Sequence, residues 1–132
     1  MRPFYRLKLR ILHVEDDASL QNLVRAALEH LGGYEVCTAA DGEQALAAAR
    51  VQPPHLLLLD LDLPGISGID TLGALRRREG LRDVPVIFLT AATDPQVLDE
   101  LRSLGVQEVL RKPFRPRLLV EAVARVLKKK ES

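Results

Sequence analysis

The sequence is short of cysteine, of long apolar runs and of charge of one sign, and each shortage excludes a class of protein. Its 132 residues contain a single cysteine, Cys37, which excludes an internal disulfide framework and is compatible with a reducing compartment. We expect Cys37 to be a small buried hydrophobe. No apolar segment approaches the length of a membrane span, and Met1–Arg10 lacks the apolar core of a signal peptide. These absences predict a soluble cytoplasmic protein without membrane contact.

The charge balance excludes a strongly basic or acidic chain. Lys and Arg number 19 against 18 Asp and Glu, which gives a formal net charge of +1. Such a balance is not the basic footprint of a nucleic-acid-binding domain, so we expect no direct nucleic acid binding. The length and the 47% hydrophobic content suit one domain with one core, spanning residues 1–132.

Strand-like runs alternate with helical patterns along the chain. The runs expected as strands are Leu9–Val14, Tyr34–Thr38, His55–Asp60, Pro85–Thr90 and Val106–Arg111. The segments expected as helices are Ser19–Leu31, Glu43–Arg50, Ser67–Arg78, Asp94–Leu104 and Arg115–Lys129. Strands joined by single helices predict an α/β fold, since parallel strands need such crossovers. The expected architecture is a flavodoxin-like doubly wound (βα)5 domain with a parallel five-stranded sheet in the order 2-1-3-4-5.

Acidic residues follow two of the expected strands at the point where each strand ends. Asp60 and Asp62 close the run Leu56–Leu59, and Glu15-Asp16-Asp17 closes the run Leu9–Val14. In the expected strand order the first and third strands are neighbours, so both clusters lie at one crevice. Carboxylate oxygens at such a place suggest a pocket that binds a hard cation such as Mg²⁺ or handles phosphate.

Two further polar side chains are expected at the same edge of the sheet. Thr90 ends the fourth strand and Lys112 follows the fifth. A lysine pairs with phosphate or carboxylate, a threonine hydroxyl can donate to a phosphoryl oxygen, and an Asp carboxylate can itself accept a phosphoryl group. The set therefore points to phosphoryl chemistry.

These residues, in this order, resemble the receiver domain of two-component response regulators. The resemblance runs from about Arg10 to Leu127, and the residues that carry it are Glu15-Asp16, Asp60 with Pro64 and Gly68, Thr90-Ala91 and Lys112-Pro113. It implies that Asp60 is the phosphoacceptor and that Lys112 and Thr90 bind the phosphoryl group. It also implies an Mg²⁺ site made by Glu15, Asp16, Asp60 and the backbone carbonyl of Asp62, and a cis Lys112–Pro113 bond.

The resemblance also implies partners. The phosphoryl donor in this family is a phosphohistidine on a sensor histidine kinase or phosphotransfer protein, or a small phosphodonor. Such a chain catalyses only its own phosphorylation and dephosphorylation and is not a conventional enzyme. Family members signal, and some dimerise, through the face made by the fourth helix, fifth strand and fifth helix. Here that face contains Leu98, Leu101, Arg102, Val109 and Arg117.

One departure from the family keeps an alternative open. Receivers usually carry Tyr or Phe three residues before the lysine, where this chain has Val109. Valine is short and stiff at χ1, so the usual aromatic switch cannot operate. The alternative is a receiver-fold interaction module that works without phosphorylation. A phosphatase of the haloacid-dehalogenase type, suggested by Asp60-Leu61-Asp62, fits less well because that motif follows the first strand there.

Several other polar residues are expected to have structural roles. Asp17 and Asp94 are placed to cap helices. His13 and His55 lie in predicted strands as structural residues, and His30 lies on a helix surface. Arg76-Arg77-Arg78 is interpreted as an exposed helix end favoured by the helix dipole, or as part of a partner surface.

Overall fold

A computed structural model describes residues 8–131, and the residues before and after them, including most of Met1–Arg10, lie outside the described part. The strands are β1 Arg10–Val14, β2 Glu35–Ala39, β3 Leu56–Asp60, β4 Val86–Thr90 and β5 Glu108–Arg111. The helices are α1 Ala18–Ala26, continued by a π-helical segment Ala27–Leu31, then α2 Gly42–Val51, α3 Gly68–Arg76, α4 Pro95–Ser103 and α5 Pro116–Glu131. These bounds agree with the predicted elements to within a residue or two.

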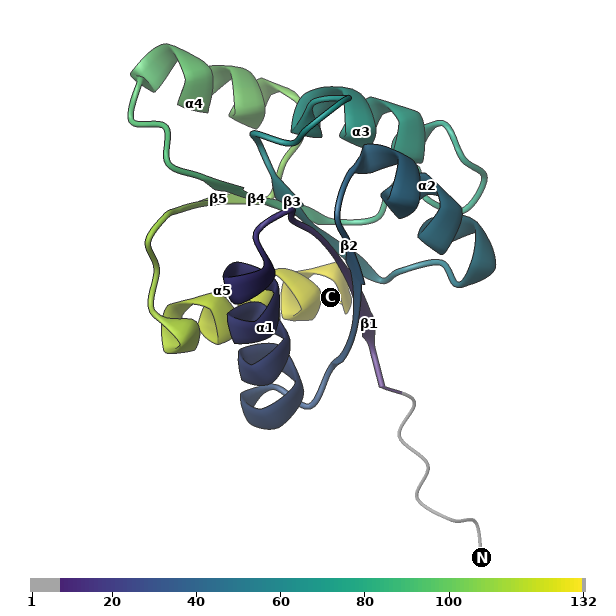
Figure 1. Ribbon diagram of the computed structural model, residues 1–132, viewed down its shortest axis with the longest axis vertical. Helices are drawn as coiled ribbons and strands as arrows, with labels where there is room; N and C mark the ends of the chain where they lie inside the picture. The colour runs from purple at the N-terminus through teal and green to yellow at the C-terminus, as the bar shows by residue number, and fades with distance from the viewer. Residues whose placement is uncertain (1–7, 132) are drawn as a thin grey trace, which may run out of the picture.

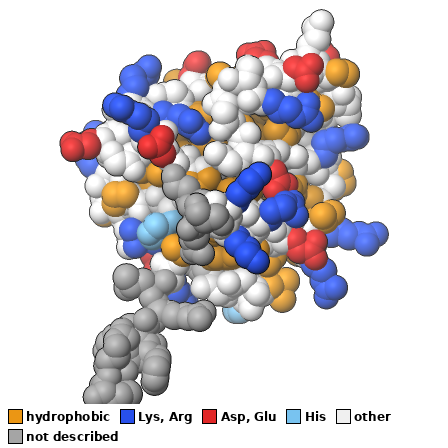
Figure 2. Space-filling model, turned by 180° about the vertical axis from the view of Figure 1, so that it is seen from behind, with side chains coloured by type: hydrophobic (Ala, Val, Ile, Leu, Met, Phe, Trp, Pro, Cys, Tyr) orange, Lys and Arg blue, Asp and Glu red, His pale blue; other side chains and the backbone are white. Residues whose placement is uncertain are grey.

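The strands form one parallel sheet in the order β2-β1-β3-β4-β5, which confirms the predicted topology. Helices α1 and α5 cover one face of the sheet, and α2, α3 and α4 lie on the other (Figure 1). None of the described helices is long and apolar enough to cross a membrane. On the face seen in Figure 2, basic and acidic side chains are interspersed.

The leucine run of β3 ties the two cores together. Leu57 and Leu59 belong to the core under α2, α3 and α4, whereas Leu56 and Leu58 belong to the core under α1 and α5. All four are fully buried. A strand that is buried on both faces must be apolar at every position, which is why this run does not alternate.

Short polar side chains begin the helices. Asp17 accepts a hydrogen bond from Leu20 N, and Asp94 accepts one from Gln96 N, which confirms both predicted caps. Two leucines of the first helical segment are exposed: Leu23 is 42% exposed and Leu31 is 66% exposed. Leu31 lies in the π-helical segment, whose wider turns shift the residues out of the α-helical phase.

Cys37 is exposed, so the prediction that it is buried is wrong. The cause is the position of β2 at the edge of the sheet. Val36 and Ala39 on this strand are buried against the helix layers, but Cys37 lies where the helices leave the strand uncovered. A strand-like sequence pattern does not distinguish a central strand from an edge strand.

His13 lies in a strand and His30 on a helix surface, as expected, whereas His55 lies just outside the strand predicted to contain it and is exposed. His55, directly before β3, accepts a hydrogen bond from Arg10 N at 2.8 Å through Nδ1, and His30 is exposed. His13, within β1, is fully buried, and neither ring nitrogen has a hydrogen-bond partner among the described residues. Burial, together with the charges of Lys112 and Arg25, lowers the pKa of His13 to about 3.

Two glycines on α3 have opposite surroundings. A Cβ at Gly68 would lie 2.3 Å from the carbonyl oxygen of Asp60, so only glycine allows the helix to begin this close to the end of β3. A Cβ at Gly73 would meet nothing within 4 Å. The fold of the monomer therefore requires glycine at position 68 and not at position 73.

The pKa of His13 predicts acid sensitivity. Its ring is neutral in the folded protein above about pH 3, whereas an unfolded histidine gains a proton near pH 6.5. The stability contributed by the neutral ring is therefore present above pH 6.5 and is lost as the pH falls toward 3. We expect His13→Leu to reduce the loss of unfolding free energy between pH 7 and about pH 4.5 by roughly 2 kcal/mol. Urea unfolding at both pH values measures this, and equal losses in both proteins would contradict it.

The two glycines predict opposite effects of the same substitution. Gly73→Ala should stabilise the isolated chain by about 0.5–1 kcal/mol, the usual gain of alanine over glycine within a helix. Gly68→Ala should destabilise it by about 1–3 kcal/mol, the range for overpacking, because the backbone must move. Urea unfolding of the two variants provides a matched comparison within one helix. A stable Gly68→Ala protein would refute the close packing of α3 on β3.

Candidate functional site

The predicted polar residues meet at the carboxyl edge of the sheet. Glu15 follows β1, Asp60 and Thr90 end β3 and β4, and Lys112 follows β5. The exposed fraction is 1% for Glu15, 4% for Asp60 and 0% for Thr90. Groups that lie 97 residues apart in the chain, Glu15 and Lys112, are in hydrogen-bond contact here, because parallel strands all end on the same side.

The ammonium group of Lys112 bridges two buried carboxylates. Its Nζ lies 3.1 Å from Glu15 Oε1 and 3.2 Å from Asp60 Oδ2. Burial alone lowers the pKa of Lys112, but the bond to Glu15 and the charge of Asp60 outweigh it and raise the pKa. The lysine is therefore a fixed positive charge at the centre of the site.

Glu15 is held by contacts from Asp17, which caps α1, and from Gln21 within α1. Its Oε2 accepts a hydrogen bond from Asp17 N at 3.2 Å, and its carbonyl oxygen accepts one from the Gln21 amide. Burial and the neighbouring Asp60 raise the pKa of Glu15, although the bond to Lys112 opposes this. A cation bound at the site would reduce the repulsion between the carboxylates of Glu15 and Asp60.

Asp60 has its two carboxylate oxygens in different contacts. Oδ2 pairs with Lys112, and Oδ1 accepts a hydrogen bond from Asp62 N at 3.1 Å. The side chain of Asp62 is itself exposed. The sequence pointed to Asp62 through its carbonyl, but it gave no signal for this N–H donor, which depends on the turn after β3.

One oxygen each from Glu15, Asp16 and Asp60 lie within 4.8 Å of one another, so these three could hold a metal ion. Asp16 is exposed and the other two are buried. Hard carboxylate oxygens at the mouth of a crevice are the donors that Mg²⁺ takes, together with water and phosphate oxygens. The structure thus brings together the carboxylates expected from the sequence.

Thr90 is buried beside this cluster and is tied to the loop before α4. Its Oγ1 accepts a hydrogen bond from Ala92 N at 2.9 Å, and its carbonyl oxygen accepts one from Lys112 N at 2.8 Å. Thr90 therefore connects the position of the lysine with that of the loop. The Lys112–Pro113 peptide bond is cis, as the resemblance implied.

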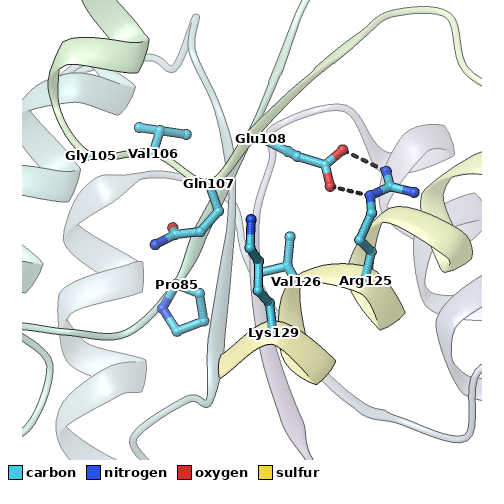
Figure 3. Close-up of a pocket in the computed structure, with 8 residues that line it drawn as sticks. All are labelled: Pro85, Gly105, Val106, Gln107, Glu108, Arg125, Val126 and Lys129. Carbon is cyan, nitrogen blue, oxygen red and sulfur yellow. Dashed lines mark hydrogen bonds and ion pairs between the residues drawn. The ribbon is translucent and has the colours of Figure 1, made fainter. Parts of the chain in front are cut away.

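Two hollows lie on different sides of this arrangement. An apolar one of about 560 Å³ borders the site and is lined by Leu20, Leu23, Pro113 and Phe114 among others. No sequence pattern predicts this hollow, which in the structure accompanies the exposure of Leu23. Another, of about 660 Å³, lies at the opposite end of the sheet between β5 and α5 (Figure 3). There Arg125 donates two hydrogen bonds to Glu108, at 2.7 and 2.8 Å, which fixes α5 to β5.

Comparison with known proteins agrees with this geometry. Residues 11–124 match the family model described as the response regulator receiver domain. The chain is 41% identical to the DNA-binding response regulator MtrA of Mycobacterium tuberculosis over 126 residues, which are 95% of this chain and 53% of MtrA. It is 38% identical to the phosphate regulon transcriptional regulatory protein PhoB of Pseudomonas aeruginosa over 119 residues, which are 90% of this chain and 52% of PhoB. The chain thus spans about half the length of these curated relatives.

Solved structures show the same fold. Chemotaxis protein CheY4 of Vibrio cholerae superposes with a TM-score of 0.85 at 32% identity, covering 91% of this chain and 99% of that one. The receiver domain of sensor histidine kinase PA1611 from P. aeruginosa, described with a magnesium ion in its active-site cleft, gives a TM-score of 0.82 at 33% identity, covering 92% and 99%. With the family model matched along most of its length, this chain belongs to the response regulator receiver domain family, the signalling modules of two-component systems.

Proposed function

We propose that Asp60 accepts a phosphoryl group and that the chain, as a single receiver domain with its core at residues 10–127, signals through the resulting aspartyl phosphate. The observation that carries the proposal is the bridge from Lys112 to both Glu15 and Asp60 inside a cluster of acidic residues. A carboxylate that is buried, fixed through both oxygens and paired with a lysine is positioned for phosphoryl transfer, which depends on orientation and charge neutralisation.

The acidic cluster suits Mg²⁺. Three carboxylates, Glu15, Asp16 and Asp60, face one ammonium group, so the site keeps an excess of negative charge that a divalent cation would balance. These three and the backbone carbonyl of Asp62 are the proposed ligands, all of them hard oxygen donors. When bound, Mg²⁺ supplies positive charge to the phosphoryl oxygens.

The transfer itself is a displacement at phosphorus. A carboxylate oxygen of Asp60 forms the new O–P bond as the N–P bond of the phosphohistidine breaks, and the imidazole leaves with the bonding electron pair. Lys112 moves its ion pair from the free carboxylate to the phosphoryl oxygens. Thr90, which accepts a hydrogen bond from Ala92 N, can donate its own hydroxyl proton to a phosphoryl oxygen. In a separate step, water attacks the phosphorus of the aspartyl phosphate, the O–P bond to Asp60 breaks, and inorganic phosphate leaves with Asp60 restored, so the chain acts only on itself.

We propose two kinds of partner for this chain, a phosphoryl donor and a partner bound at an output surface. The donor is a sensor histidine kinase or a phosphotransfer protein in the cytoplasm, and the apolar hollow at Leu20, Leu23 and Phe114 offers it a contact beside Asp60. The proposed output surface is the face of α4, β5 and α5, through which a homodimer can also form. We propose no direct contact of this chain with nucleic acid or with a membrane.

Val109 sets how this output surface responds. It is half-buried and packs against the core under α4, and its short side chain cannot swing between two positions as an aromatic ring can. We therefore assign the signal to the loop of residues 91–94, which Thr90 controls. The alternative module that never uses phosphate has no need for the complete set of acids, Thr90 and Lys112.

The phosphoacceptor is tested by Asp60→Asn with Asp62→Asn as the matched control. Incubation with acetyl phosphate and Mg²⁺ should add one phosphoryl group to the wild type and to Asp62→Asn but none to Asp60→Asn, as read by intact-protein mass spectrometry. Removal of Mg²⁺ with a chelator should abolish the modification. Modification of Asp60→Asn to the wild-type level would refute the assignment.

The role of Thr90 is tested with beryllofluoride, which stands in for the phosphoryl group on an aspartate. Thr90→Ala should weaken binding about ten- to a hundredfold, because a hydrogen bond to a charged group contributes about 1.5–3 kcal/mol. At saturation its amide NMR shifts in residues 91–94 should be smaller than those of the wild type, whereas Thr90→Ser should keep them. Equal shifts in all three proteins would show that the loop responds without the hydroxyl.

A further inference from the structure

Helix α3 carries an uncovered face that the proposed function does not use. Its inner face is buried through Gly68, Thr71, Leu72 and Leu75, whereas Asp70, Gly73 and Arg77 on the opposite side are exposed. A hollow of about 580 Å³ runs along this outer side toward the end of α4. Apolar residues on its wall include Ile66, Ile69 and Leu104, the last of which is 38% exposed.

The charges on this face have no counterpart within the described part of the chain. Neither the carboxylate of Asp70 nor the guanidinium groups of Arg76 and Arg77 take part in any ion pair there, and Nε of Arg76 is buried without a hydrogen-bond partner. A cation that pairs with Asp70 along the helix would stand three or four residues later. Gly73 and Ala74 occupy those positions, so Asp70 is left for a group outside its own helix.

The arrangement of these charges is symmetrical about Gly73. Asp70 lies three residues before it, and Arg76 and Arg77 lie three and four residues after it. If two α3 helices cross antiparallel at Gly73, Asp70 of each copy faces Arg76 and Arg77 of the other. A two-fold contact repeats every such pair, which makes the surface self-complementary.

Gly73 itself supports this contact. Glycine within a helix is less favourable than alanine, and nothing in the monomer lies close enough to require it. A second helix backbone crossing at this position would require it, because a missing side chain permits close approach.

We propose that the outer face of α3 binds a second copy of this chain in a two-fold dimer that is separate from the α4, β5 and α5 face. The apolar wall of the hollow supplies buried area, and the charge pairs set the antiparallel register. Because these pairs are near the surface and the helix is short, the dimer is weak. It does not depend on phosphorylation of Asp60.

The test uses two charge variants of the whole chain, Asp70→Arg and the double variant Arg76→Asp, Arg77→Asp, in sedimentation equilibrium without any phosphodonor. The wild type should show a monomer–dimer equilibrium. Each variant places like charges opposite one another and should raise the dissociation constant at least about tenfold. An equimolar mixture of the two variants restores opposite charges and should form a heterodimer of near wild-type affinity.

The mixture also serves as a folding control, because only two folded chains can associate through this face. Arg117→Asp, on α5, should leave the wild-type equilibrium unchanged, and salt at about 1 M should weaken it because the Debye length falls to about 3 Å. A wild type that stays monomeric up to a concentration of about 0.5 mM would overturn the proposal. So would variants that dimerise like the wild type, a mixture that does not associate, or loss of the dimer in Arg117→Asp.

Discussion

The bridge of Lys112 between Glu15 and Asp60 is the interaction on which the rest of the site depends. Two carboxylates that are almost fully buried would repel each other and raise the cost of desolvation. The ammonium group at 3.1 and 3.2 Å makes their burial tolerable. The lysine can stand there because β5 runs parallel to β4, so that its end reaches the same edge as β1 and β3. The position of Lys112 after β5 thus follows from the parallel topology, and its charge offsets the repulsion between Glu15 and Asp60.

The fold explains why the site is concentrated at one edge. The buried strand β3 belongs to both cores, so the position of Asp60 at its end is fixed by packing on two sides. Gly68 then brings α3 against the backbone of Asp60. Polar atoms of the site hold each other through short backbone contacts, such as Asp62 N to Asp60 and Asp17 N to Glu15. The carboxylates are thus held by several contacts without any ligand, and preorganised groups of this kind are what electrostatic catalysis requires.

Much of this could be predicted from the sequence, and the failures have a common cause. The leucines of β3 and the caps Asp17 and Asp94 follow from local patterns, and the strand order is one of the common orders of doubly wound sheets. The exposure of Cys37 and Leu31 could not be predicted, because it depends on where helices stop covering an edge strand and on a π-helical segment. The same holds for the N–H of Asp62 and the apolar hollow at Leu23, which arise only when separate segments meet.

The two edges of the sheet bear on how the protein behaves at high concentration. An edge strand presents free N–H and C=O groups and is a template for adding strands from other molecules. Here β2 begins with the exposed Glu35, and β5 ends with the exposed Arg111 and carries Glu108, which is paired with Arg125. Charges on both outer strands disfavour the pairing of an edge strand with an edge strand of another molecule. The apolar interior strands are therefore flanked on both sides by strands that carry charge.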